Sequence, residues 1–251
     1  MKLLNLTYPI VAGIVGVLSA CSVSEPDIDA GPTGDNLRLT SISILTKNYV
    51  TVNYDAQGRV TRLTRGSDEM TVTYSPLEIK LIERDDYDDE ADVTYWKNIT
   101  LNSQGYISNA TVVEDEDVSV YSFEYDNAGH LVRAIEDGYY PIVYNWDSSG
   151  RMTKVYDDEQ TVVFEYHSTP NLHLQWDPNV PLYSGFVEYT GLLGVAPSYF
   201  VKSLTTIEDN YVSSKLFYNY RLNDNGWVIQ SRIFDDDDDA LPYMNWNYSK
   251  K

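Results

Sequence analysis

The stretch Tyr125-Asp126-Asn127-Ala128-Gly129 is one of five copies of a short turn, and these copies decide the fold. An Asp or Asn side chain accepts hydrogen bonds from backbone two residues later, which suits the first corner of a type I turn. A glycine at the end supplies the left-handed conformation that closes a hairpin through a bulge. The copies therefore predict five β-hairpins of one design. Each copy has a large residue, then Asp or Asn, two variable positions and a glycine, and the glycines are Gly58, Gly105, Gly129, Gly150 and Gly226.

The segments between these turns alternate between two sets of side chains. In residues 118–125, Val118 and Val120 lie on one face of the segment, whereas Tyr121 and Phe123 lie on the other. This period of two, in segments rich in Tyr, Val, Ile and Thr, is typical of half-buried β-strands. No apolar stripe of helical period extends beyond two turns. The sequence therefore predicts an all-β chain with almost no helix outside its N-terminal segment.

The spacing of the glycines indicates the size of the repeated unit. Gly105 and Gly129 are 24 residues apart, and Gly129 and Gly150 are 21 residues apart. The longer gaps leave room for degenerate turns near Tyr74 and Tyr166. Each unit is thus two strands and two reversals, which form an antiparallel β-meander. We expect about fourteen to seventeen strands curled into an open barrel or a layered wrap, because an open twisted sheet rarely exceeds about ten strands.

Every second reversal has a different, acidic composition. Residues 85–92 and 157–159 are examples, and 24 of the 38 acidic residues of the chain fall in such reversals. Because strand direction alternates, the glycine turns and the acidic reversals must mark opposite rims of the sheet. Asp86, Asp88 and Glu90 alternate as calcium ligands would, but no reversal has the Asp-x-Asp-x-Asp-Gly pattern of a calcium loop. We therefore favour solvated, mutually repelling turns, expect no metal or other cofactor, and keep calcium as the weaker alternative.

The N-terminal residues predict a location. A largely apolar run ends in Leu18-Ser19-Ala20-Cys21, which has the form of a bacterial lipobox, in which Cys21 becomes the lipidated first residue of the mature protein. A transmembrane helix is the alternative, and polar residues such as Asn5 within the run disfavour it. We expect a signal peptide at residues 1–20, a lipidated tether at 21–36 and a single β-repeat domain at 37–251. Cys21 would hold this domain at the outer membrane, with exposure at the cell surface left open.

Cysteine content and charge narrow the chemistry. Cys21 is the one cysteine of the chain, so the mature domain has no disulfide, no thiolate metal site and no cysteine nucleophile. The formal net charge of −20 argues against nucleic acid and against anionic lipid headgroups as partners. We expect membrane lipid, through Cys21, as one partner and an envelope protein or a glycan as another.

The sequence carries no recognisable catalytic motif. It has no Gly-x-Ser-x-Gly nucleophile elbow, no phosphate-binding glycine loop and no His-Glu-x-x-His pair. His130 follows a glycine turn, so we expect it on the surface of a strand. His167 and His173 have no carboxylate at ligand spacing that would complete a zinc site. We therefore expect a protein that is not an enzyme, although a pair of glycosidase carboxylates could be recognised only from geometry.

The repeats are interrupted between about residues 167 and 200. Four prolines break the strands there, and aromatic residues are concentrated. Long irregular segments over a regular scaffold are a usual place for function, and the centres of interfaces are enriched in Trp and Tyr. One interpretation is a docking site, and its candidate partner-binding residues are Trp176, Tyr183, Phe186, Tyr189 and Tyr199. The interpretation that we favour is a plug that covers an open end or face of the sheet.

Several of these motifs together resemble one known family. They are the lipobox, the turns of Tyr-Asp-x-x-Gly-Arg type at residues 54–59 and 146–151, and the Gly-Leu-Leu-Gly…Ser-Tyr-Phe-Val-Lys-Ser-Leu segment at residues 191–204. Over roughly residues 37–248 the chain is similar to uncharacterised Bacteroidetes-type lipoproteins of domain of unknown function family 4595, whose hairpins are similar to the YD repeats of RHS proteins. The resemblance implies a curled antiparallel repeat sheet on an envelope lipoprotein, and it carries no established activity or catalytic residue.

These observations predict a non-catalytic envelope lipoprotein with a binding or structural role. The first alternative is a carbohydrate-binding surface lipoprotein, because aromatic rings such as those of residues 176–200 can stack on sugar faces. The second and weaker alternative is a glycoside hydrolase.

Overall fold

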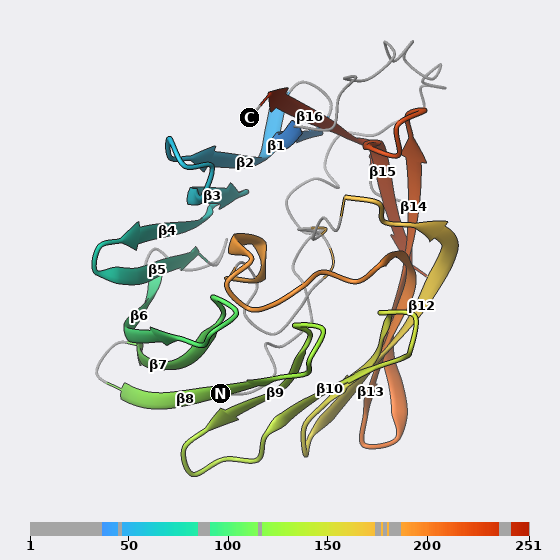
Figure 1. Ribbon diagram of the computed structural model, residues 1–251. Coiled ribbons are helices and arrows are strands. Elements are labelled where there is room, and N and C mark those ends of the chain that lie inside the picture. The colour runs from blue at the N-terminus through green and yellow to red at the C-terminus, as the bar shows by residue number, and fades with distance from the viewer. Residues whose placement is uncertain are drawn as a thin grey trace.

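The described residues form a ring of sixteen strands, seen here in a computed structural model (Figure 1). The structure describes residues 37–44, 47–84, 91–114, 117–173, 177, 180, 187–235 and 242–250. The signal peptide, Cys21 and the tether predicted from the sequence lie outside these residues. The strands are β1 (Leu37–Ile44), β2 (Lys47–Tyr54), β3 (Val60–Arg65), β4 (Asp68–Tyr74), β5 (Leu77–Arg84), β6 (Ala91–Leu101), β7 (Ile107–Glu114), β8 (Asp117–Tyr125), β9 (Leu131–Glu136), β10 (Ile142–Trp146), β11 (Met152–Tyr156), β12 (Gln160–Pro170), β13 (Tyr199–Glu208), β14 (Tyr211–Leu222), β15 (Val228–Asp235) and β16 (Met244–Lys250).

The strands follow one another around the barrel in chain order, and every neighbouring pair is antiparallel. The predicted all-β antiparallel meander of fourteen to seventeen strands is confirmed. The barrel is closed and not open, because β1 pairs with β16 from Leu37 opposite Lys250 to Ile44 opposite Met244. Closure satisfies the backbone groups of both edge strands, which would otherwise be left unpaired. Within the described residues the one helical element is the 3-10 helix η2 (Val187–Thr190).

The two ends of the barrel have different connections, as the sequence predicts. Connections from even-numbered to odd-numbered strands lie at one end, which we call the glycine rim, and it holds the five glycine turns. The degenerate turn at Tyr74 lies there too, as does the insertion between β12 and β13. Connections from odd-numbered to even-numbered strands lie at the other end, which we call the acidic rim. It includes the β7–β8, β9–β10, β11–β12 and β13–β14 turns, with carboxylates such as Asp137, Asp158 and Asp209.

The barrel is apolar inside and polar outside. On β5, Ile79 and Leu81 are buried in the core, whereas Lys80 lies between them on the opposite face. On β12, Val162 and Phe164 are buried in the same way. One continuous cluster of buried residues runs through all sixteen strands and includes Val187 and Leu193 of the insertion. The lumen is therefore filled by side chains, and strand alternation decides which residues fill it.

The described residues contain no helix with the length and hydropathy needed to cross a membrane.

Candidate functional site

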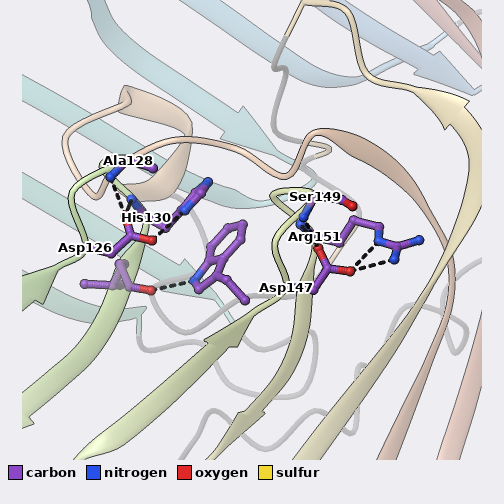
Figure 2. A network of polar contacts seen from close by, with 8 residues as sticks. Asp126, Ala128, His130, Asp147, Ser149 and Arg151 are labelled. Atoms are coloured by element: carbon purple, nitrogen blue, oxygen red, sulfur yellow. Dashed lines mark hydrogen bonds and ion pairs between the residues drawn. The ribbon is translucent and has the colours of Figure 1, made fainter.

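The glycine turns share one hydrogen-bond pattern, in which the Asp or Asn side chain organises five residues. Asp147 is an example, because its Oδ1 accepts the backbone N–H groups of Ser149 at 2.9 Å and Arg151 at 3.1 Å. Its backbone carbonyl accepts the N–H of Gly150 at 3.1 Å. Gly150 has a φ of +72°, which side chains other than glycine rarely adopt. The predicted structural role of this turn is thus visible atom by atom (Figure 2).

The residue after each glycine also belongs to the turn. The guanidinium of Arg151 binds Asp147 Oδ2 at 2.6 Å, and Arg59 binds Asp55 Oδ2 at 2.7 Å in the same way. Although slight burial raises the pKa of the Asp147 carboxyl, the hydrogen bonds from Arg151 and Ser149 outweigh it and hold this pKa below its usual range. An Asp followed four residues later by an Arg therefore forms a local ion pair, and this ion pair stabilises the turn.

His130 occupies the same position and makes the equivalent contact. Its Nδ1 lies 2.9 Å from Asp126 Oδ2 (Figure 2). Its ring stacks on the indole of Trp146 at a centroid distance of 4.2 Å. Its side chain is only 12% exposed, so the prediction of a surface strand residue was wrong. The cause is the neighbouring hairpin, whose Trp146 covers the imidazole. Asp126 and His130 thus form part of a turn, which is a sufficient explanation for this carboxylate–imidazole pair.

Within the described residues, aromatic side chains of six even-numbered strands each donate a hydrogen bond to a backbone carbonyl of the preceding strand, a feature that the sequence analysis missed. Tyr125 Oη donates to the carbonyl of Ile107 at 2.8 Å, and Trp146 Nε1 donates to that of Leu131 at 2.8 Å. Burial raises the pKa of the Tyr125 hydroxyl well above its usual value, which keeps it a donor. We call these bonds the aromatic stitches, and the other four join Tyr54 to Leu39, Tyr74 to Val60, Tyr166 to Met152 and Tyr248 to Val228.

The returning part of the insertion lies on the glycine turns of three successive hairpins. Ile107 donates its N–H to the carbonyl of Leu192 at 2.8 Å. Val195 donates to the carbonyl of Gly129 at 3.0 Å, and Ser198 donates to that of Gly150 at 2.9 Å. These three bonds tie the insertion to the β6–β7, β8–β9 and β10–β11 turns in order. The segment after η2 is seen crossing the inside of the ring (orange in Figure 1).

The outgoing part of the insertion packs on the opposite side of the same rim. His173 stacks on Trp227 with centroids 3.6 Å apart, and its Nε2 lies 3.0 Å from the carbonyl of Asn225. Leu172 approaches to 2.9 Å from the place that a Cβ on Gly226 would occupy. The insertion therefore reaches from the β14–β15 turn to the β6–β7 turn. Its described residues lie across the mouth of the barrel at the glycine rim, as the favoured plug interpretation requires.

The candidate partner-binding residues of the insertion differ in how far the structure describes them. Tyr189 packs against the core cluster, and burial raises the pKa of its hydroxyl well above the usual value. Tyr199 is half-buried at the start of β13, with the Arg151 guanidinium 5.6 Å from its ring centroid. Trp176, Tyr183 and Phe186 lie outside the described residues, so their role in docking stays a prediction.

The inner side of the acidic rim carries buried polar groups. Arg65 is 8% exposed and lies 3.8 Å from Asp68. Burial, and next the neighbouring carboxylate of Asp68, raises the pKa of Glu83, an effect that Arg65 partly offsets. Among the described residues, no three His, Cys, Asp or Glu side chains are arranged to hold a metal ion. The calcium alternative, at residues 86–90, falls outside the described part of the chain.

Comparisons with known proteins agree with this geometry. A porin-like protein from Bacteroides uniformis matches with a TM-score of 0.56 at 17% identity, over 85% of this chain and 98% of that one. A porin-like protein from Bacteroides vulgatus matches with a TM-score of 0.52 at 13% identity, over 84% and 98% respectively. At these identities the likeness concerns the fold. A comparison with curated protein sequences finds no match. A family model matches residues 52–232, and the chain thus belongs to the family described as domain of unknown function (DUF4595) with porin-like fold.

Proposed function

We propose that the protein is a non-catalytic envelope lipoprotein with a binding or structural role, whose barrel is held beside the outer membrane by lipid on Cys21. The observation that carries this proposal is the polarity of the barrel wall. Among the described residues, apolar side chains from every strand form one buried cluster in the lumen, whereas charged side chains such as those of Arg62 and Arg133 are exposed on the outer face. The fold is porin-like, but its apolar core is the reverse of the polar interior of a membrane-spanning barrel.

The outer face lacks what a membrane-spanning barrel needs. Such a barrel presents an apolar band about 25 Å tall to lipid, and a Lys or Arg at the middle of that band costs about 2–4 kcal/mol. Here ion pairs lie on the outer face, between residues of neighbouring strands. They join Arg62 to Glu69 at 2.7 Å and Arg133 to Glu124 at 3.5 Å across neighbouring strands. These charges favour water, and not acyl chains, around the wall.

The part of the interior that the described residues form is likewise unlike the water-filled passage of a porin. Trp96, Tyr121 and Phe123 stack on one another in the lumen, with centroids about 6 Å apart in each pair, between 5.9 and 6.3 Å. Trp96 and Tyr121 are at most 2% exposed. A filled barrel with a polar wall needs another means of attachment to a membrane. The lipobox that ends at Cys21 would supply it, since the several acyl chains of a bacterial lipoprotein anchor far more durably than one.

The chemistry of the described residues supports a role other than catalysis. The carboxylate–imidazole pair of Asp126 and His130 is accounted for as a turn that matches the nearby turn of Asp147 and Arg151. This explanation of the pair as part of a turn is consistent with a binding or structural role, because function on a scaffold of repeated hairpins resides in surfaces and loops.

The test compares the full-length protein with Cys21→Ala in bacterial cells. Wild type is expected to incorporate radiolabelled palmitate and to fractionate with the membrane, whereas Cys21→Ala is expected to remain unlabelled. The barrel domain of residues 22–251, produced without a signal peptide, is expected to fold to a β-sheet circular dichroism spectrum in buffer free of detergent. The proposal fails if that domain folds only in detergent, or if it inserts into planar bilayers and conducts ions. It also fails if wild type takes up no palmitate.

A further inference from the structure

We infer that the glycine rim is the surface that faces the phospholipid membrane and that the acidic rim points away from it; this inference rests on the proposed lipidation of Cys21. The first support is the point at which the chain enters the barrel. β1 begins at Leu37, opposite Lys250 at the end of β16. Tyr54, which precedes a glycine turn, donates its hydroxyl to the carbonyl of Leu39 at 2.7 Å. Cys21 is therefore connected to the barrel at the glycine rim.

The difference in charge between the two rims favours the same orientation. At the glycine rim, Asp55 and Asp147 are paired with Arg59 and Arg151, so the turns that carry them are close to neutral. At the acidic rim the described carboxylates outnumber the described basic groups, which are Lys47, Arg65 and Arg84. An anionic lipid surface attracts a nearby basic side chain by about 1 kcal/mol and repels a nearby carboxylate to a similar extent. Those carboxylates are Asp68, Glu69, Glu83, Asp92, Glu114, Asp117, Glu136, Asp137, Asp157, Asp158, Glu159, Glu208, Asp209 and Asp235.

This orientation decides which surface a partner meets. The acidic rim would point outward with the exposed Tyr139 and Tyr140 of the β9–β10 turn and with Tyr211 at the start of β14. A partner that approaches from outside would thus meet tyrosines among carboxylates. The insertion, where the sequence placed the candidate docking residues, would lie on the membrane side of the barrel.

The test measures the depth of one residue at each rim. Ser148 is exposed in a glycine turn, and Ser67 is exposed in the β3–β4 turn at the acidic rim. The variants Ser148→Cys and Ser67→Cys are matched, because each replaces one atom of an exposed turn residue. Lipidation blocks the sulfur of Cys21, so a maleimide fluorophore labels the new cysteine alone. The labelled, lipidated proteins are reconstituted in phosphatidylethanolamine–phosphatidylglycerol vesicles that contain a nitroxide-headgroup lipid.

We expect the fluorophore on Ser148→Cys to be quenched several-fold more strongly than that on Ser67→Cys. Equal quenching, or stronger quenching at residue 67, would overturn the orientation while leaving the lipid anchor in place. If neither protein floats with the vesicles, the anchor itself is absent, and the orientation falls together with the proposed function. Circular dichroism and melting of each labelled variant against wild type establish that both barrels are folded.

Discussion

Replacing Tyr166 with phenylalanine tests whether the aromatic stitches stabilise the barrel. Tyr166 lies in β12, and its hydroxyl donates to the carbonyl of Met152 in β11 at 2.8 Å. Burial raises the pKa of this hydroxyl well above its usual value. The change Tyr166→Phe keeps the ring and its packing and removes one oxygen atom. It therefore isolates the hydrogen bond from the hydrophobic contribution of the side chain.

The expected loss follows from the burial of this bond. A typical intramolecular hydrogen bond contributes about 0.5–1.5 kcal/mol, and a buried acceptor that loses its donor costs about 1–3 kcal/mol. We expect Tyr166→Phe to lower the free energy of unfolding by about 1–1.5 kcal/mol. For a domain of this size that corresponds to a decrease in melting temperature of roughly 2–6 °C.

The matched control is Tyr140→Phe, because Tyr140 is 72% exposed in the β9–β10 turn and its hydroxyl is in water. Guanidinium unfolding, followed by tryptophan fluorescence and by circular dichroism, measures both variants at pH 7. The control is expected to stay within about 0.5 kcal/mol of wild type, as surface changes usually do. The reasoning is refuted if Tyr166→Phe is as stable as wild type, or if the two variants lose the same amount.

Three further outcomes follow from the structure. Gly194→Ala should lower the melting temperature more than Gly138→Ala, because both glycines have positive φ but a Cβ on Gly194 would come within 2.6 Å of the Gly129 carbonyl, whereas a Cβ on Gly138 meets nothing within 4 Å. Glu83→Gln should raise the free energy of unfolding at pH 7, measured by urea unfolding, because the raised pKa of Glu83 means that its charged form opposes folding. This gain should vanish below about pH 4.5, where wild-type Glu83 is protonated in both the folded and the unfolded state. Stability should fall as pH rises from about 10 to 12, because burial raises the pKa of Tyr54 to about 12 and the unfolded chain loses that proton first; a flat melting temperature across this range would contradict the burial of its hydroxyl.

The local parts of the fold could be predicted from sequence because their causes lie within a few residues. Asp147 and Gly150 belong to one turn, and the bonds that they make span at most four positions. Alternation in β8 and its neighbours likewise assigns each residue to a face without knowledge of the rest of the chain. The separation of glycine turns from acidic turns followed from strand direction alone.

Closure, the environment of His130 and the aromatic stitches could not be predicted in the same way. The β1–β16 pairing places Leu37 opposite Lys250, and nothing in the sequence of either strand identifies the other strand as its partner. The burial of His130 depends on Trp146 of the next hairpin. A tyrosine before a turn looks the same whether its hydroxyl meets water or a carbonyl, so the stitches became visible only when neighbouring hairpins were placed side by side.

The sequence by itself thus determined the class of the protein: an antiparallel meander of repeated hairpins, with two chemically distinct rims. It could do so because turn geometry and strand alternation are short-range effects. The tertiary structure alone decided that the sheet closes, that apolar side chains fill its lumen, and that the described residues of the insertion cross the glycine rim with Leu192 and Val195 bound to the turns. Those features depend on contacts between residues far apart in the chain, whose formation is settled by the total burial and hydrogen bonding of the closed barrel and by no single segment of it.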